Sequence, residues 1–230
     1  MSLLGRMARA FSSIANPRSW DDWRRLRRMA RTLSFIGDPG TFDDWHRTWE
    51  AREAALAALF GPPEPEVFHS RTPLDRGGEA DVLAFRGYVP GVTYVTADLT
   101  GAPEGDVLAQ VPNSTGCYEL MLCTRAPVSW AAPALAQLAR YTLDAVVESG
   151  HTMYVGPLAG SSLEHLAFAE PDLGGKPFAF LGRRYGLLLG VGITEAELRL
   201  AQSERTRALI ARLRGAGVFP YTDPGRPSIA

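Results

Sequence analysis

The chain has 230 residues, of which 46% are hydrophobic and 21% are charged. These proportions are close to the globular average, and they exclude a chain that is disordered over most of its length. The net charge of −1 argues against a protein built wholly around nucleic acid. Two cysteines, Cys117 and Cys123, are too few for a disulfide framework or a zinc site. The longest apolar run, Leu187–Ile193, is too short for a membrane span.

The N-terminal segment is much more basic than the rest of the chain. Residues 1–35 contain eight arginines and two aspartates, whereas the remainder has 16 basic and 23 acidic residues. The start of the chain lacks the unbroken apolar stretch and cleavage site of a secretory signal. We therefore expect a cytoplasmic protein. The charge difference predicts that the basic segment either attracts the acidic remainder or binds a separate partner.

A repeat follows an N-terminal arm at residues 1–16. Pro17–Arg25 (PRSWDDWRR) reappears 22 residues later as Pro39–Arg47 (PGTFDDWHR). In each copy a hydroxyl side chain and two aspartates suit a helix N-terminus, and an apolar stripe follows at helical spacing. The sequence predicts a helical hairpin over residues 17–60 that docks on the domain behind it.

The pattern changes after residue 66, where short strand-like runs alternate with turns and helices. A helix is predicted for Ala131–Ser149, a short one near Ser161–Phe168, and a last one from a capping box at Thr194 to Arg214. The expected strands are Ala80–Phe85, Thr93–Asp98, Cys117–Thr124, His151–Val155, Phe178–Leu181 and Tyr185–Val191. Strands and helices without regular βαβ alternation predict an α+β domain over residues 66–230, with a mixed or antiparallel sheet.

Two stretches of this domain resemble the suppressor-of-fused-like (SUFU-like) family. The first is Tyr94–Gly101 (YVTADLTG), followed by Gly116–Leu122 (GCYELML), Trp130 and the helix after it. The second is Leu187–Leu198 (LLLGVGITEAEL), which runs on to the Asp-Pro-x-Arg ending at Asp223–Arg226. Between them these stretches cover roughly residues 75–229. The turn Ala97-Asp98-Leu99 differs from the family's commoner Gly-Met-Ser form.

The resemblance implies a non-enzymatic protein-binding domain of bacterial type. Animal members of the family sequester a transcription factor, and bacterial members are linked with polymorphic toxin systems as immunity proteins. It implies a protein partner, with a toxin as the candidate. Neither the resemblance nor the residues imply a metal or a cofactor, and the oligomeric state stays open.

Six residues are candidates for contact with a partner. Aromatic side chains dominate binding hot spots, which points to the hairpin's Trp20, Phe42 and Trp49. The remaining candidates, Asp98, Glu119 and Arg226, lie in the stretches that carry the resemblance. Glu119 shares a strand face with apolar neighbours; the alternative is a structural ion pair with Arg125 or Arg226.

Two other functions remain open. A small hydrolase or transferase would use Glu164 and His165 as a proton-transfer pair, although no nucleophile is recognisable beside them. The arginines around the first helix suit phosphates, but solvated arginines on a packed helix are the simpler interpretation, so nucleic-acid binding is not expected to be the function.

Overall fold

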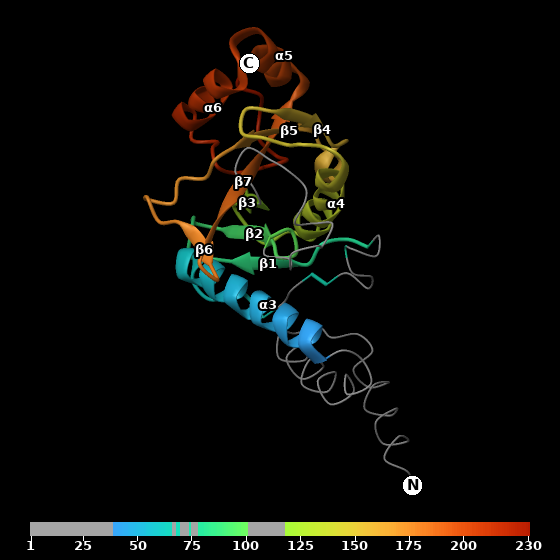
Figure 1. The fold of residues 1–230 in the computed structure, drawn as a ribbon. Helices are drawn as coiled ribbons and strands as arrows, with labels where there is room; N and C mark the ends of the chain where they lie inside the picture. The colour runs from blue at the N-terminus through green and yellow to red at the C-terminus, as the bar shows by residue number, and fades with distance from the viewer. Residues whose placement is uncertain (1–38, 66–67, 70–73, 75–77, 101–117) are drawn as a thin grey trace.

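The computed structural model describes residues 39–65, 68–69, 74, 78–100 and 118–230. Within them a seven-stranded mixed sheet has helices on both faces (Figure 1). The α+β class expected from the sequence is confirmed. The first helix of the predicted hairpin and the N-terminal arm lie outside the described residues. The segment predicted as the second helix of the hairpin forms α3, Pro39–Phe60.

The sheet has the strand order β1-β2-β3-β7-β5-β4, with β6 paired to the start of β7. Only β3 and β7 are parallel; the other pairs are antiparallel. The strand bounds are β1 Val82–Phe85, β2 Val92–Thr96, β3 Tyr118–Thr124, β4 Thr152–Tyr154, β5 Leu163–Ala169, β6 Phe178–Phe180 and β7 Arg183–Thr194.

Each face of the sheet has its own hydrophobic core. On one face α4, Ala131–Asp144, packs Leu135 and Ala139 over β1, β2 and β3. On the other face lie α3, α5 (Glu195–Glu204) and α6 (Thr206–Gly215), with Trp49, Leu56 and Leu209 in the core. Figure 1 shows α3 beneath β1, at the opposite end of the molecule from α5 and α6. The sheet is therefore the middle of three layers.

The predicted short helix near Ser161–Phe168 is wrong, because this segment forms strand β5. Leu166 and Phe168 point into the α4 core, while Ala167 and Ala169 point into the other. A strand buried on both faces has an apolar run that periodicity alone cannot distinguish from a buried helix. Pairing with β7 on one side and β4 on the other decides in favour of the strand.

Two helix ends also differ from the prediction. Helix α4 stops at Asp144, and Ala145 is extended, so that the β-branched Val147 can enter the α4 core. The long C-terminal helix is two helices, separated at Arg205, which has φ 76°. The capping box at its start is confirmed: the Glu197 N–H donates to Thr194 Oγ1 over 3.3 Å, and the Thr194 N–H donates to the Glu197 carboxylate over 2.9 Å.

Candidate functional site

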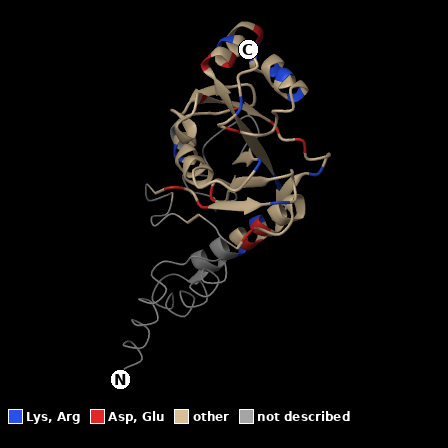
Figure 2. Cartoon of the chain, turned by 180° about the vertical axis from the view of Figure 1, so that it is seen from behind, with Lys and Arg blue, Asp and Glu red and all other residues tan. Residues whose placement is uncertain are grey.

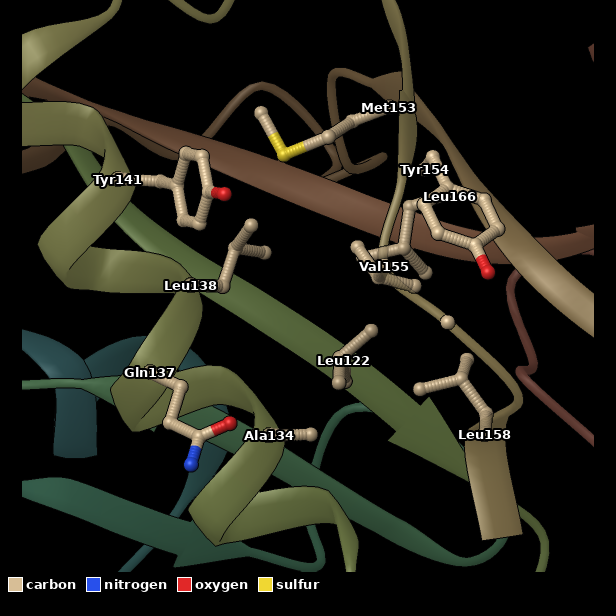
Figure 3. A pocket seen from close by; sticks show the side chains of 11 residues that line it. Leu122, Ala134, Gln137, Leu138, Tyr141, Met153, Tyr154, Val155, Leu158 and Leu166 are labelled. Atoms are coloured by element: carbon tan, nitrogen blue, oxygen red, sulfur yellow. The ribbon is translucent and has the colours of Figure 1, made fainter. Parts of the chain in front are cut away.

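A groove of about 310 Å³ opens between α4 and β4 on the α4 face of the sheet. Helix α4 contributes Leu138 and Tyr141 to one wall, and β4 contributes Met153 to the other. Figure 3 shows Tyr141 and Leu138 facing Met153 across the groove. The floor is formed by Leu122 of β3 and Leu166 of β5. A concave apolar surface of this size is typical of a binding site.

The rim of the groove exposes two large aromatic side chains. Tyr141 is 66% exposed and Tyr154 is 64% exposed, although both flank an apolar hollow. A tyrosine offers apolar area and a hydroxyl while losing little conformational entropy on binding, which is why it is frequent in interfaces. Figure 2 shows α4 with few charged residues, so this part of the surface is easy to dehydrate.

Strand β4 is an open edge of the sheet. It pairs with β5 on one side, and no described strand pairs with its other side. The Val155 N–H donates to Glu164 O of β5 over 2.9 Å. Because N–H directions alternate along an antiparallel strand, the N–H of Tyr154 points away from β5. An unpaired strand edge is a template for another extended chain.

The opposite edge of the sheet, β1, is covered. The Phe68 N–H donates to Val82 O over 3.1 Å, and the Glu64 N–H donates to Ala84 O over 2.8 Å. The segment after α3 thus bonds to the outer side of β1. Of the two edges, only β4 offers backbone groups to a partner within the described residues.

The groove does not carry acid–base machinery. Apart from the tyrosines, its lining contains no titratable side chain, so it has no pair of groups for general acid–base work. Of the predicted pair Glu164 and His165, His165 has its Nε2 3.1 Å from Glu195 Oε2 of α5. The ring of His165 packs edge-on against Tyr154, with the ring centroids 5.2 Å apart.

Glu119 lies fully buried in β3 and holds the turn after β2. Its carboxylate accepts hydrogen bonds from the Thr96 and Thr100 hydroxyls at 2.5 and 2.6 Å, and from the Thr100 N–H at 2.9 Å. Arg52 of α3 lies 3.5 Å away and donates to the carbonyls of Ala97 and Thr100. Neither predicted partner, Arg125 or Arg226, pairs with Glu119. The cation comes from α3, which no local pattern in β3 indicates.

Asp98 occupies the same turn and is one-fifth exposed. It accepts a hydrogen bond from the Asp81 N–H over 2.7 Å and lies 3.9 Å from Arg52. Burial, and next the charge of Asp81, raise the pKa of Asp98 to about 7, although Arg52 opposes the rise. Burial also raises the pKa of Glu119. Both carboxyl groups are thus kept in an environment that disfavours their charge. Together with Arg52 they form a buried polar network that shapes the turn and joins it to α3.

Arg226 is committed to an ion pair in a second network. Its guanidinium binds both carboxylate oxygens of Glu197 at 2.6 Å and donates to Gly192 O at 2.8 Å. The same carboxylate accepts from the Ile229 N–H at 2.9 Å. Arg226 therefore fastens the C-terminal segment to the start of α5.

The aromatic candidates of the hairpin are placed as follows. Trp49 is 1% exposed and packs in the core between α3 and the sheet, so its indole does not reach the surface. Phe42 belongs to α3, but its side chain lies outside the described residues, as does the whole of Trp20. The exposed aromatic side chains beside the groove are instead Tyr141 and Tyr154, which sequence reasoning missed. Tyr141 lies at the margin of the apolar stripe of α4 and ends in a polar hydroxyl, which is the signal that could have indicated it. Tyr154 has no such local signal, because only the order of the strands in the sheet shows that β4 is an edge.

No helix among the described residues is long and apolar enough to cross a membrane. In the same part of the chain, no three His, Cys, Asp or Glu side chains are grouped so that they could hold a metal ion.

An α+β domain with an unpaired edge strand beside an apolar groove fits the class of protein-binding domains. The family model for suppressor of fused protein (SUFU) matches residues 79–227, so the chain belongs to the SUFU family. A search of curated proteins gave no match.

Solved structures of the family share the fold. A structure of the Sufu–Fu complex has a TM-score of 0.62 at 18% identity, covering 79% of this chain and 92% of that one. A SUFU homologue from Neisseria gonorrhoeae has 0.57 at 17%, covering 80% and 97%. Drosophila Suppressor of Fused has 0.57 at 16%, covering 73% and 47%, so this chain matches about half of the Drosophila protein.

Proposed function

We propose that this chain binds a protein partner by accepting an extended segment on the open edge of β4, with apolar side chains of that segment in the groove beside α4. The observation that supports this is the coincidence of an unpaired strand edge with a groove of about 310 Å³. Main-chain hydrogen bonds would supply affinity, and the groove would select alternate side chains.

The chemistry of the groove favours binding over catalysis. Tyr141, Leu138 and Met153 offer apolar area to a partner, whereas titratable groups other than tyrosine are missing from the lining. His165 pairs with Glu195, and the ring of His165 packs against the ring of Tyr154 at the groove rim. The solved structure of a Sufu–Fu complex shows that a protein of the same fold binds another protein, which agrees with a binding role here.

A comparison of two substitutions at one position tests the proposed strand pairing. Tyr154→Ala removes the exposed ring but keeps the backbone N–H, whereas Tyr154→Pro removes both; proline is tolerated on edge strands. With a co-purified partner, Tyr154→Ala should weaken binding by several-fold and Tyr154→Pro by at least ten-fold, measured by calorimetry.

One control variant and one check of folding accompany these variants. Arg199→Ala removes an exposed side chain of α5 and should leave binding unchanged. Circular dichroism should show the same fold in all variants. If Tyr154→Pro binds as tightly as Tyr154→Ala, no main-chain bond forms there and the strand-pairing proposal is wrong.

The identity of the partner is a separate question. A polymorphic toxin in the bacterial cytoplasm is the partner that the family resemblance suggests. Co-expression with the product of the adjacent gene tests this directly. If that product is a toxin, it should stop the growth of the host cells when expressed alone. The toxin proposal requires that co-expression of the wild-type chain restores growth and that co-expression of Tyr154→Pro does not. An adjacent metabolic enzyme that fails to bind would contradict it.

A further inference from the structure

The hairpin formed by β6 and β7 ends in an unusual turn. Phe180 pairs with Arg183, so Leu181 and Gly182 form a two-residue turn, and both have positive φ, 47° and 75°. A turn of this kind requires positive φ at both positions and strongly favours Asn-Gly. Leucine is a poor residue there, since its side chain disfavours this conformation.

Leu181 gains no compensating burial. Its side chain is 49% exposed, one of the few large hydrophobic side chains that the described structure leaves open to solvent. The hairpin beneath it is well packed: Phe178 and Phe180 are buried, and the ring of Tyr185 stacks on Phe180 with centroids 4.3 Å apart. The tip is therefore a rigid support that presents a strained, exposed leucine, and observed strain of this kind is a reason to look for function.

Positive charge surrounds this leucine. Lys176, Arg183 and Arg184 are all exposed, and none forms an ion pair with a carboxylate of the described residues. Arg183 lies over the ring of Tyr185, with Cζ 5.8 Å from the centroid. Ala179 pairs with Arg184 on the outer face of the hairpin and leaves that face open. We call Lys176, Ala179, Leu181, Arg183 and Arg184 the hairpin-tip surface.

We propose that the hairpin-tip surface is a second protein-binding surface, which inserts Leu181 into an apolar recess of a partner whose surrounding surface is acidic. Unpaired arginines around an apolar anchor are the arrangement expected of a binding hot spot with complementary charge. Three cations are fewer than the four to eight that typically mark binding to anionic lipids, so a protein is favoured over a membrane. Figure 1 places β6 beside α3 and away from β4, so this surface is independent of the groove.

Photocrosslinking tests the proposal in the full chain. A photoreactive amino acid at Ala179 keeps Leu181 and the arginines in place, and the cross-linked partner peptide is identified by mass spectrometry. That peptide should lie in an acidic surface. The yield should fall at least five-fold in Arg183→Glu/Arg184→Glu and in Leu181→Asn. The control Arg205→Glu/Arg207→Glu makes the same charge change on exposed arginines elsewhere and should keep the yield.

Leu181→Asn separates binding from folding. Asparagine suits this turn better than leucine, so the melting temperature should stay the same or rise while the cross-link is lost. A yield that survives Leu181→Asn or the charge reversal would overturn the proposal. So would sedimentation with phosphatidylglycerol vesicles that the same substitutions abolish, because the surface would then bind lipid. Tyr154→Pro, included in parallel, reports on the groove alone.

Discussion

The guanidinium of Arg226 and the carboxylate of Glu197 form a two-pronged ion pair, with both N–O distances 2.6 Å. The side chains are 6% and 0% exposed, and the two residues lie 29 positions apart in the chain. Burial by itself raises the pKa of Glu197, but the bonds from Arg226, the Ile229 N–H and the Thr194 N–H lower it overall. The carboxylate that caps α5 is thus also the anchor of the C-terminal segment.

Removal of Arg226 should be strongly destabilising. In Arg226→Met the buried charge of Glu197 loses its partner, and such a loss typically costs about 3–5 kcal/mol. Urea unfolding at pH 7 measures the change. Arg199→Met is the control, because its pair with Glu195 is exposed and should contribute less than about 0.5 kcal/mol. Equal losses in the two variants would show that the buried pair does not anchor the segment.

Asp98 should make the protein less stable as pH rises. The folded pKa of Asp98, about 7, is above its ordinary value of 3.8, so folding favours the protonated form. The stability from this group is complete below about pH 4 and is lost as pH rises through 7. Asp98→Asn cannot ionise and keeps an acceptor for the Asp81 N–H. It should exceed the wild type by roughly 1–3 kcal/mol at pH 8.

Urea unfolding of the wild type and Asp98→Asn at pH 4, 6 and 8 provides the measurement. The advantage of the variant should be smallest at pH 4, where the wild-type carboxyl is protonated in the folded state and partly protonated in the unfolded chain. A variant that is less stable than the wild type at pH 8 would mean that the attraction of Arg52 outweighs burial.

Gly192 should not accept a side chain. A Cβ atom there would lie 2.7 Å from Thr222 Cγ2 and 2.9 Å from Leu163 Cδ1. Thr222 cannot easily move, since it is fully buried, its N–H donates to Cys123 O at 2.8 Å and its Oγ1 accepts from the Gly192 N–H at 2.8 Å. Gly192→Ala should therefore lose about 1–3 kcal/mol through overpacking.

The double variant Gly192→Ala/Thr222→Ser tests the cause. Serine keeps the hydroxyl but removes the methyl group that blocks the new Cβ, so part of the loss should be recovered in urea unfolding. Gly215→Ala, where a Cβ meets no atom within 4 Å, should not be destabilised. If the double variant recovers none of the lost stability, the contact with Thr222 is not the cause of the destabilisation in Gly192→Ala.

Replacement of Arg205 by glycine should stabilise the protein. It separates α5 from α6 with φ 76° and ψ 144°, a conformation that is close to a region used almost only by glycine. Arg205→Gly should raise stability by about 0.5–1.5 kcal/mol, and differential scanning calorimetry should show a higher melting temperature. Arg207→Gly, two residues later inside α6, should do the opposite by about 0.5–1 kcal/mol. A lower melting temperature for Arg205→Gly would show that its side chain matters more than its backbone.

Elements with local signals were predicted well from the sequence. The capping box at Thr194 and Glu197 is formed by residues three positions apart, so it can be recognised from the local sequence alone. The strands around Tyr94, Tyr118 and Leu188 carry apolar, β-branched or aromatic runs between turn residues, and they were placed to within a few residues. The same ordered motifs carried the resemblance to the SUFU family, which the family model confirms over residues 79–227.

Elements decided by long-range packing were not predictable. The apolar run of β5 is compatible with either a buried helix or a buried strand. Only its place between β7 and β4 in the sheet makes it a strand. Glu119 was recognised as a charge on an apolar face, but its partner Arg52 comes from a helix 67 positions earlier, which no spacing rule connects to it.

The sequence by itself determined the fold class, the family and the caps, because these depend on periodicity, turn chemistry and short-range hydrogen bonds. Tertiary structure alone decided which strand is an open edge and where Tyr141 and Tyr154 stand beside a groove. An edge is defined by the absence of a neighbour in the sheet, and a groove by helices and strands distant in the chain; both follow from the order in which strands pair.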